Sequence, residues 1–72
     1  MNQKDIADRI MVYLEDKYRS TGWPFIHLKD ISSYFYQIDI LPALNDLRMK
    51  GLIRKRENVN GILVELIVNE DY

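Results

Sequence analysis

The stretch QIDILPALNDLRMKGLI, residues 37–53, is the segment on which the expected fold depends. Ile40, Leu44 and Leu47 recur at the three- and four-residue spacing of an amphipathic helix, so they share the side of the helix that is buried. We therefore expect a helix whose apolar stripe forms part of the core.

The ends of this helix are marked by three residues. Asp39 is a suitable N-cap, and Gly51 follows the last periodic residue as a helix terminator. Pro42 falls in the first turn, where its missing N–H would have had no intrahelical partner. Pro42 is therefore compatible with a helix that begins at Asp39.

Two more helices are expected before it. The first covers residues 3–20, with Asn2 as its N-cap and Gly22 at its end. Its buried stripe consists of Ile6, Ile10, Tyr13, Leu14 and Tyr18. A brief extended segment at Phe25–His27 follows. The second helix covers residues 28–35, from the spacing of Leu28, Ile31 and Phe35, and a tight connection at residues 36–38 leads to the third.

The segment LIRKRENVNGILVELIV predicts a β-hairpin after the third helix. Its Asn-Gly pair at residues 60–61 is the strongest short-range signal for a two-residue turn. That turn sets Arg56 opposite Glu65, an opposite-charge pair that favours this register. A four-residue loop at residues 58–61 instead sets Arg54 opposite the same glutamate, so both registers stay open.

Size and composition limit what the chain can be. With 72 residues it has room for one core, so a single domain over residues 1–72 is expected. Hydrophobic residues make up 47% and charged residues 29%, a globular and not a disordered composition. The absence of cysteine excludes a disulfide framework, so stability has to come from packing or from self-association, which leaves a homodimer open.

The sequence also indicates a location. MNQKDIADRI lacks the apolar core of a signal peptide, and no run approaches the roughly 20 apolar residues of a membrane span. We expect a cytoplasmic protein with no membrane contact. Because the net charge is −1, no global basic field draws the chain to a polyanion, and any nucleic-acid surface must be local.

The order helix, short strand, helix, tight turn, helix and hairpin resembles the winged helix-turn-helix superfamily from about Asp5 to Val68. The most specific part, LPALNDLRMKGLIRKRENVNGILVEL, is similar to the recognition-helix-to-wing segment of MarR-like and ArsR-like regulators. Gly51 matches the glycine that ends the third helix there, and Leu52 and Ile53 match the Leu-Ile that enters the core. The resemblance implies an α+β fold of three helices, a short strand before the second helix and a C-terminal hairpin wing.

The chain departs from these families in ways that leave the family open. The turn before the third helix usually has a glycine, and residues 36–38 supply none. The flanking dimerisation helices of MarR-like regulators are missing, and one histidine without cysteine cannot provide the ligands of an ArsR-like metal sensor. Since there is also no Gly-rich phosphate loop or nucleophile-base pair, we expect no enzyme activity, metal or other cofactor.

The third helix is a poor candidate for base recognition, which normally uses Arg or Lys on guanine and Asn or Gln on adenine. A carboxylate such as Asp46 at about 7 Å from a phosphate costs roughly 2 kcal/mol. Asp46 can instead pair with Lys50 one turn away, or accept a hydrogen bond from the amino group of cytosine. The residues expected to face outward are Asp39, Pro42, Ala43, Asp46 and Lys50, flanked by Asn45 and Met49.

Five basic residues follow within nine positions without an intervening acid, and they are half of the ten in the chain: Arg48, Lys50, Arg54, Lys55 and Arg56. Such a patch favours phosphate contact, which positions a protein on a duplex without reading its sequence. Charge that protects an exposed edge strand from aggregation is the alternative interpretation of Lys55 and Arg56.

Two hypotheses for function follow. The first is a small winged-helix protein that binds double-stranded DNA, as a transcriptional regulator or an accessory factor. Its candidate DNA-binding residues are Gln37, Asn45, Arg48, Lys50, Arg54, Lys55 and Arg56. The second is a winged-helix module that contacts a protein and not DNA. Its candidate surface is Trp23, Tyr34, Tyr36 and Met49.

Overall fold

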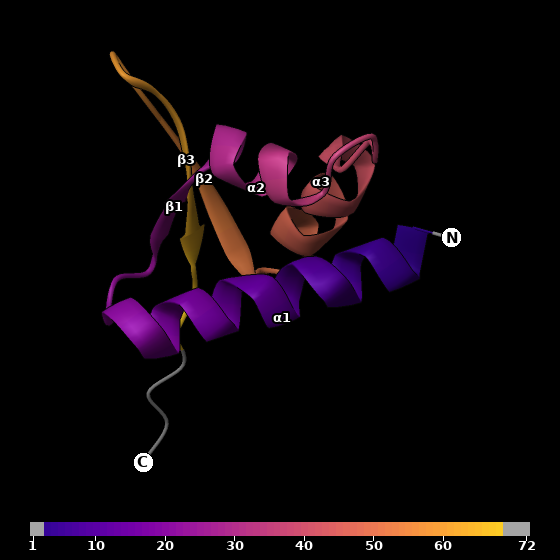
Figure 1. Cartoon of the computed structure of the whole chain (residues 1–72), viewed down its shortest axis with the longest axis horizontal. Helices are drawn as coiled ribbons and strands as arrows, with labels where there is room; N and C mark the ends of the chain where they lie inside the picture. Colours follow the sequence, from indigo (N-terminus) through magenta and orange to yellow (C-terminus); the bar gives the residue numbers. More distant parts are fainter. Residues whose placement is uncertain (1–2, 69–72) are drawn as a thin grey trace.

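The computed structural model describes residues 3–68, which form three helices and one three-stranded antiparallel sheet (Figure 1). In chain order the elements are α1 (Gln3–Thr21), β1 (Phe25–His27), α2 (Leu28–Tyr34), α3 (Leu41–Met49), β2 (Ile53–Asn58) and β3 (Gly61–Leu66). This α+β architecture was expected and is compatible with a winged helix. The proposed cap Asn2 lies outside the described residues.

The helices pack against one face of the sheet, whose strand order is β1-β3-β2. In Figure 1, α1 runs beneath α2 and α3, and the β2–β3 hairpin projects away from all three helices. Ile10, Leu14 and Ile31 are the largest fully buried side chains, at the centre of this packing. The rest of the core is Ala7, Phe35, Ile40, Ala43, Leu44, Leu47, Ile53, Val64 and Leu66.

The predicted helix boundaries agree with the structure to within two residues. Gly22 ends α1 with a φ of 70°, and its N–H donates to the carbonyl of Tyr18 at 2.7 Å. The predicted N-cap of α3 is one residue early, because Ile40 occupies that position. The carboxylate of Asp39 still accepts the N–H of Leu41, at 3.2 Å, so it satisfies one of the free donors of the first turn.

The favoured register of the hairpin is wrong, and the alternative pairing is correct. Arg54 lies opposite Glu65, and the turn residues are 59–60, between Asn58 and Gly61. Both registers keep the same side chains on the buried face, so the apolar pattern does not distinguish them. The turn distinguishes the two registers. The Asn58 side chain accepts the N–H of Asn60 at 2.8 Å and fixes the bend one residue earlier than expected.

The end of α3 is a Schellman motif built on a glycine. Gly51 has a φ of 77°, its N–H donates to Arg48, and the N–H of Leu52 donates to Leu47 at 3.1 Å. The carbonyl of Leu52 in turn accepts the N–H of Ile67, at 3.0 Å. This motif therefore sets the direction in which the chain leaves α3 and enters β2.

Replacing this glycine tests the motif. Gly51→Ala should lower the free energy of unfolding by about 1–2 kcal/mol, because an L-residue is strained at positive φ. Nothing lies within 4 Å of the added Cβ, so the cost is conformational and not steric. Met49→Ala, at a side chain that is 78% exposed, should change the stability by less than about 0.5 kcal/mol. Urea unfolding that gives equal stabilities for the two variants would contradict this assignment.

Candidate nucleic-acid interface

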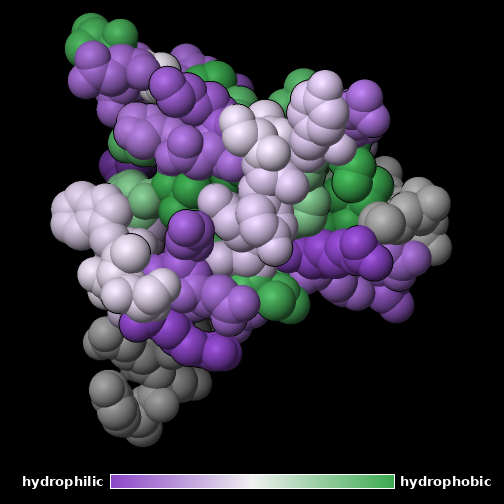
Figure 2. Space-filling model, viewed as in Figure 1, coloured by the Kyte–Doolittle hydropathy of each residue, from purple (hydrophilic) through white to green (hydrophobic). Residues whose placement is uncertain are grey.

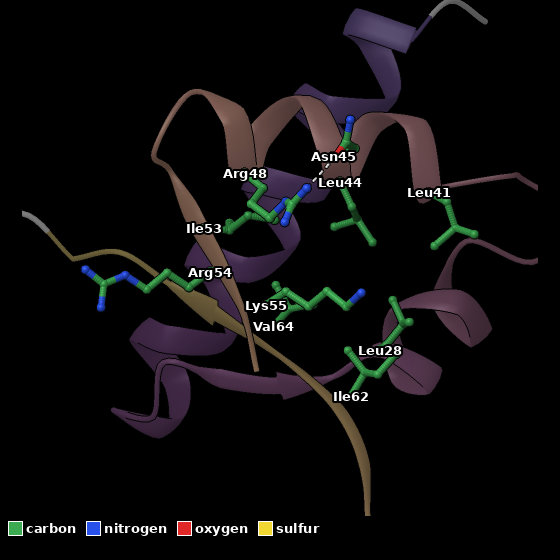
Figure 3. A pocket seen from close by; sticks show the side chains of 10 residues that line it. All are labelled: Leu28, Leu41, Leu44, Asn45, Arg48, Ile53, Arg54, Lys55, Ile62 and Val64. Carbon is green, nitrogen blue, oxygen red and sulfur yellow. Dashed lines mark hydrogen bonds between the residues drawn. The ribbon is translucent and has the colours of Figure 1, made fainter. Parts of the chain in front are cut away.

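A groove between α3 and β2 is bordered by several of the residues predicted to contact DNA (Figure 3). Asn45 and Arg48 border it from α3, and Arg54 and Lys55 border it from β2. Its floor and sides are apolar and comprise Leu28, Leu41, Leu44, Ile53, Ile62 and Val64. No acidic side chain of the described part of the chain lines it, so the charged side chains that border the groove are all basic.

The outward side of α3 differs from the one expected. Ala43 is 1% exposed and belongs to the core, so its assignment to the outward face was wrong. Together with Ile40, Leu44 and Leu47 it completes the i, i+3, i+4, i+7 stripe of the buried side. Because Ala43 also faces inward, the exposed side of α3 differs from the expected one, and Asn45 and Arg48 lie at the groove.

Asp46 does not line the groove. Its half-buried carboxylate forms the expected ion pair with Lys50 one turn later, with Nζ 3.0 Å from Oδ2. Lys50 is held by the same pair and likewise does not line the groove. The acid that seemed to oppose phosphate binding is therefore both paired and outside the candidate site.

Within the groove, Asn45 and Arg48 are linked to each other. Arg48 Nη2 donates to Asn45 Oδ1 at 2.9 Å, as marked by the dashed line in Figure 3. The amide nitrogen of Asn45 also contacts the sulfur of Met49, at 3.7 Å. One guanidinium and one amide, the groups that recognise guanine and adenine, are thus placed side by side on the exposed part of α3.

The basic run of β2 is divided between two faces, because successive side chains of a strand point to opposite sides of the sheet. Lys55 points toward the groove in Figure 3 and forms an ion pair with Glu57 at 3.2 Å. Arg56 lies on the far face, where its Nε is 2.8 Å from Glu65 Oε1 and its guanidinium is 5.9 Å from the Phe25 ring.

Arg54 borders the groove with its side chain directed away from Lys55 (Figure 3). It forms no ion pair with any described residue. Of the predicted set, the groove therefore brings together Asn45, Arg48 and Lys55, and Arg54 lies at its border with a side chain on the same face of β2 as Arg56. Gln37, Lys50 and Arg56 lie elsewhere.

The four side chains proposed for protein contact are exposed, from 61% at Trp23 to 78% at Met49. Tyr34 and Tyr36 line one hollow, Trp23 and Tyr34 line another, and Met49 lines neither. Tyr34 packs on Tyr13, with ring centroids 4.4 Å apart, whereas Met49 contacts Asn45 on α3. The role of Tyr13 was missed, because its helical spacing indicated only a core position. Burial raises its pKa above the usual 10.0, with smaller contributions from Asp30 and Tyr34.

Gln37 has a structural role that the sequence did not reveal. It has a φ of 67° in the α2–α3 turn, the one non-glycine residue with positive φ in the described part of the chain. It therefore occupies a left-handed conformation that glycine adopts at the least cost. Its side chain does not line the groove, so the prediction that it contacts DNA gains no support.

Within residues 3–68 no group of three or more His, Cys, Asp or Glu side chains could hold a metal ion. None of the helices in that range is sufficiently long and apolar to cross a membrane. Comparisons with protein-family models, with curated proteins and with solved structures found no match.

The conformation of Gln37 can be tested by substitution. Gln37→Val should destabilise the fold by about 1–2 kcal/mol, because a β-branched residue is strained at positive φ, whereas Gln37→Gly should cost nothing or gain up to about 1 kcal/mol. The control is the same pair of substitutions at Ser32, inside α2. There the valine variant should be more stable than the glycine variant, because glycine is the poorer helix former. Thermal unfolding in which valine is tolerated as well as glycine at residue 37 would refute a left-handed turn.

Proposed function

We propose that this chain is a winged-helix protein that binds duplex DNA through the groove between α3 and β2, as a cytoplasmic transcriptional regulator or accessory factor. The element order and the β1-β3-β2 sheet support this fold, with α3 in the place of the recognition helix and the β2–β3 hairpin in that of the wing. The proposed function is based on the residues that border the groove and not on a family assignment.

One observation carries the proposal: Arg48, Arg54 and Lys55 border one groove that no described acidic side chain lines. Phosphate oxygens are held by such guanidinium and ammonium groups, and contacts of this kind supply most of the affinity for non-specific DNA. Although the protein as a whole has a net charge of −1, this surface is locally positive.

The ion pairs decide which basic residues are free to contact phosphate. The Lys55–Glu57 pair is exposed on both sides, at 49% and 69%, so little stability is lost when a phosphate replaces the carboxylate. The Arg56–Glu65 pair is less accessible, because the glutamate side chain is only 19% exposed. We therefore count Arg48, Arg54 and Lys55 as the phosphate contacts and leave Arg56 out.

Sequence preference is expected to be weak. Asn45 and Arg48 are the two groove residues able to form bidentate contacts with adenine or guanine, and each already bonds to the other. Base contact would replace that bond. The neighbouring exposed side chains Leu41 and Met49 are apolar and can contact only methyl groups or sugars.

Binding should depend strongly on salt. Three phosphate contacts predict that the logarithm of the association constant falls with the logarithm of salt concentration at a slope of about −2.7 per monomer. Fluorescence polarisation with a random-sequence duplex over a range of salt concentrations measures this slope. A slope near zero, or no binding at low salt, would exclude phosphate-led recognition.

Removing one charge should change the slope in a position-dependent way. Arg54→Ala should weaken binding to all duplex sequences alike and reduce the magnitude of the slope by about 0.9, because one phosphate contact is lost. Lys4→Ala removes the same charge from an exposed position of α1 outside the groove and should leave the slope unchanged. If both variants reduce the slope equally, the effect comes from net charge and not from a contact.

A further inference from the structure

A second surface of the molecule lies on α1, away from the groove. A hollow there is bordered by Val12 of α1 and by Tyr34 and Tyr36 of α2 and the following turn. These three large side chains are 58%, 66% and 76% exposed. In Figure 2 the surface over α2 is pale, of intermediate hydropathy, next to the purple, hydrophilic surface of α1. The hollow therefore combines these apolar and aromatic side chains with polar and charged residues of α1 that also line it.

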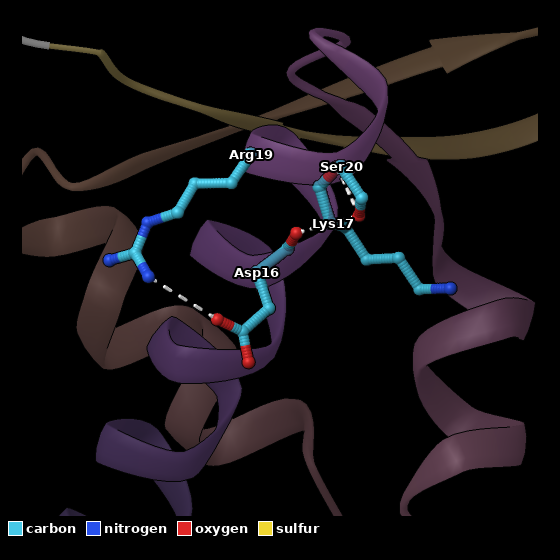
Figure 4. A network of polar contacts seen from close by, with 4 residues as sticks. All are labelled: Asp16, Lys17, Arg19 and Ser20. Carbon is cyan, nitrogen blue, oxygen red and sulfur yellow. Dashed lines mark hydrogen bonds and ion pairs between the residues drawn. The ribbon is translucent and has the colours of Figure 1, made fainter.

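The charges that border the hollow have a regular placement. Four charged residues of α1 line it, namely Asp8, Arg9, Asp16 and Lys17. Arg9 and Asp16 are seven residues apart, so they lie on the same side of α1 with Val12 between them. The Asp16 carboxylate is 3.6 Å from Arg19 in a pair that is 67% and 75% exposed (Figure 4). Arg9 forms no ion pair with any described residue.

This placement is complementary to itself. When two copies of α1 lie antiparallel about a two-fold axis near residues 12–13, Arg9 of each copy comes opposite Asp16 of the partner subunit. Residues at one heptad position face one another in this arrangement, as flanking charged positions do in antiparallel coiled coils. Two equivalent ion pairs then enclose the exposed Val12 side chains of both copies.

We propose that a second copy of this chain docks on the α1 hollow and forms a two-fold symmetric dimer. One positive and one negative residue, placed symmetrically about the midpoint between residues 12 and 13, fit a copy of the same helix better than a partner of a single charge. A standard interface buries about 800 Å² on each side, which is roughly 15% of the 5446 Å² surface of this chain. The α1 hollow and the groove share no lining residue, so this inference does not rest on DNA binding.

Charge exchange between the two positions tests the symmetry. Light scattering on the full chain at about 100 µM should give 17.2 kDa, twice the 8.6 kDa of one chain. Arg9→Glu and Asp16→Lys should each weaken the dimer about tenfold or more, because each places like charges opposite one another twice. The double variant Arg9→Glu/Asp16→Lys should restore the dimer. An equimolar mixture of the two single variants should also form dimers, since all facing charges are then opposite.

A matched control keeps the change of charge and moves it to another surface. Arg54→Glu and Glu57→Lys on β2 alter the charge by the same amounts and should leave the dimer intact. Circular dichroism of each variant confirms that the exposed substitutions leave the helices folded. A monomeric wild type overturns the proposal. So does a dimer that both single variants preserve, or one that neither the double variant nor the mixture restores.

Discussion

The buried stripe of α3 is the constraint on which the rest of the structure depends. Ile40, Ala43, Leu44 and Leu47 are between 1% and 8% exposed, and they hold the helix between α1 and the sheet. Because these four positions must face inward, the opposite edge of the helix carries Asn45 and Arg48 to the groove beside β2. The Schellman motif at Gly51 then directs the chain into β2, so that Lys55 meets the same groove.

The sequence predicted the elements well because their signals are local. Helical spacing and the positions of Gly22 and Gly51 placed all three helices to within two residues. The hairpin register was not predictable, since both registers leave the same side chains buried and the deciding contact is a single Asn58 side-chain bond. The left-handed conformation of Gln37 was not predictable either, because glutamine has no preference for positive φ.

The candidate site was predicted less completely, for two physical reasons. A run of basic residues in the sequence is not a basic patch in space, because strand alternation sends Lys55 and Arg56 to opposite faces. Acids distant in the sequence also pair with the bases, as Glu65 does with Arg56. The outward side of α3 was misjudged because alanine is small and only weakly apolar, so Ala43 did not indicate that it was buried.

The two proposed surfaces fit one arrangement. The groove lies between α3 and β2, and the α1 hollow lies against α2 and the turn that follows it, without a shared residue. A dimer through α1 would therefore leave both grooves accessible and relate them by a two-fold axis. Paired grooves suit two half-sites on one duplex, and the avidity of two sites would offset the small number of phosphate contacts in each.

The central claim is that the groove contacts DNA, and amide chemical-shift mapping by NMR tests it most directly. Titration of the labelled protein with a random-sequence duplex at low salt should shift the amides of Asn45, Arg48, Arg54 and Lys55 in a salt-dependent manner. The amides of Val12 and Asp16 on α1 should move little, unless the oligomeric state changes. Shifts confined to α1 and α2, or none in α3 and β2 at any salt concentration, would contradict the account.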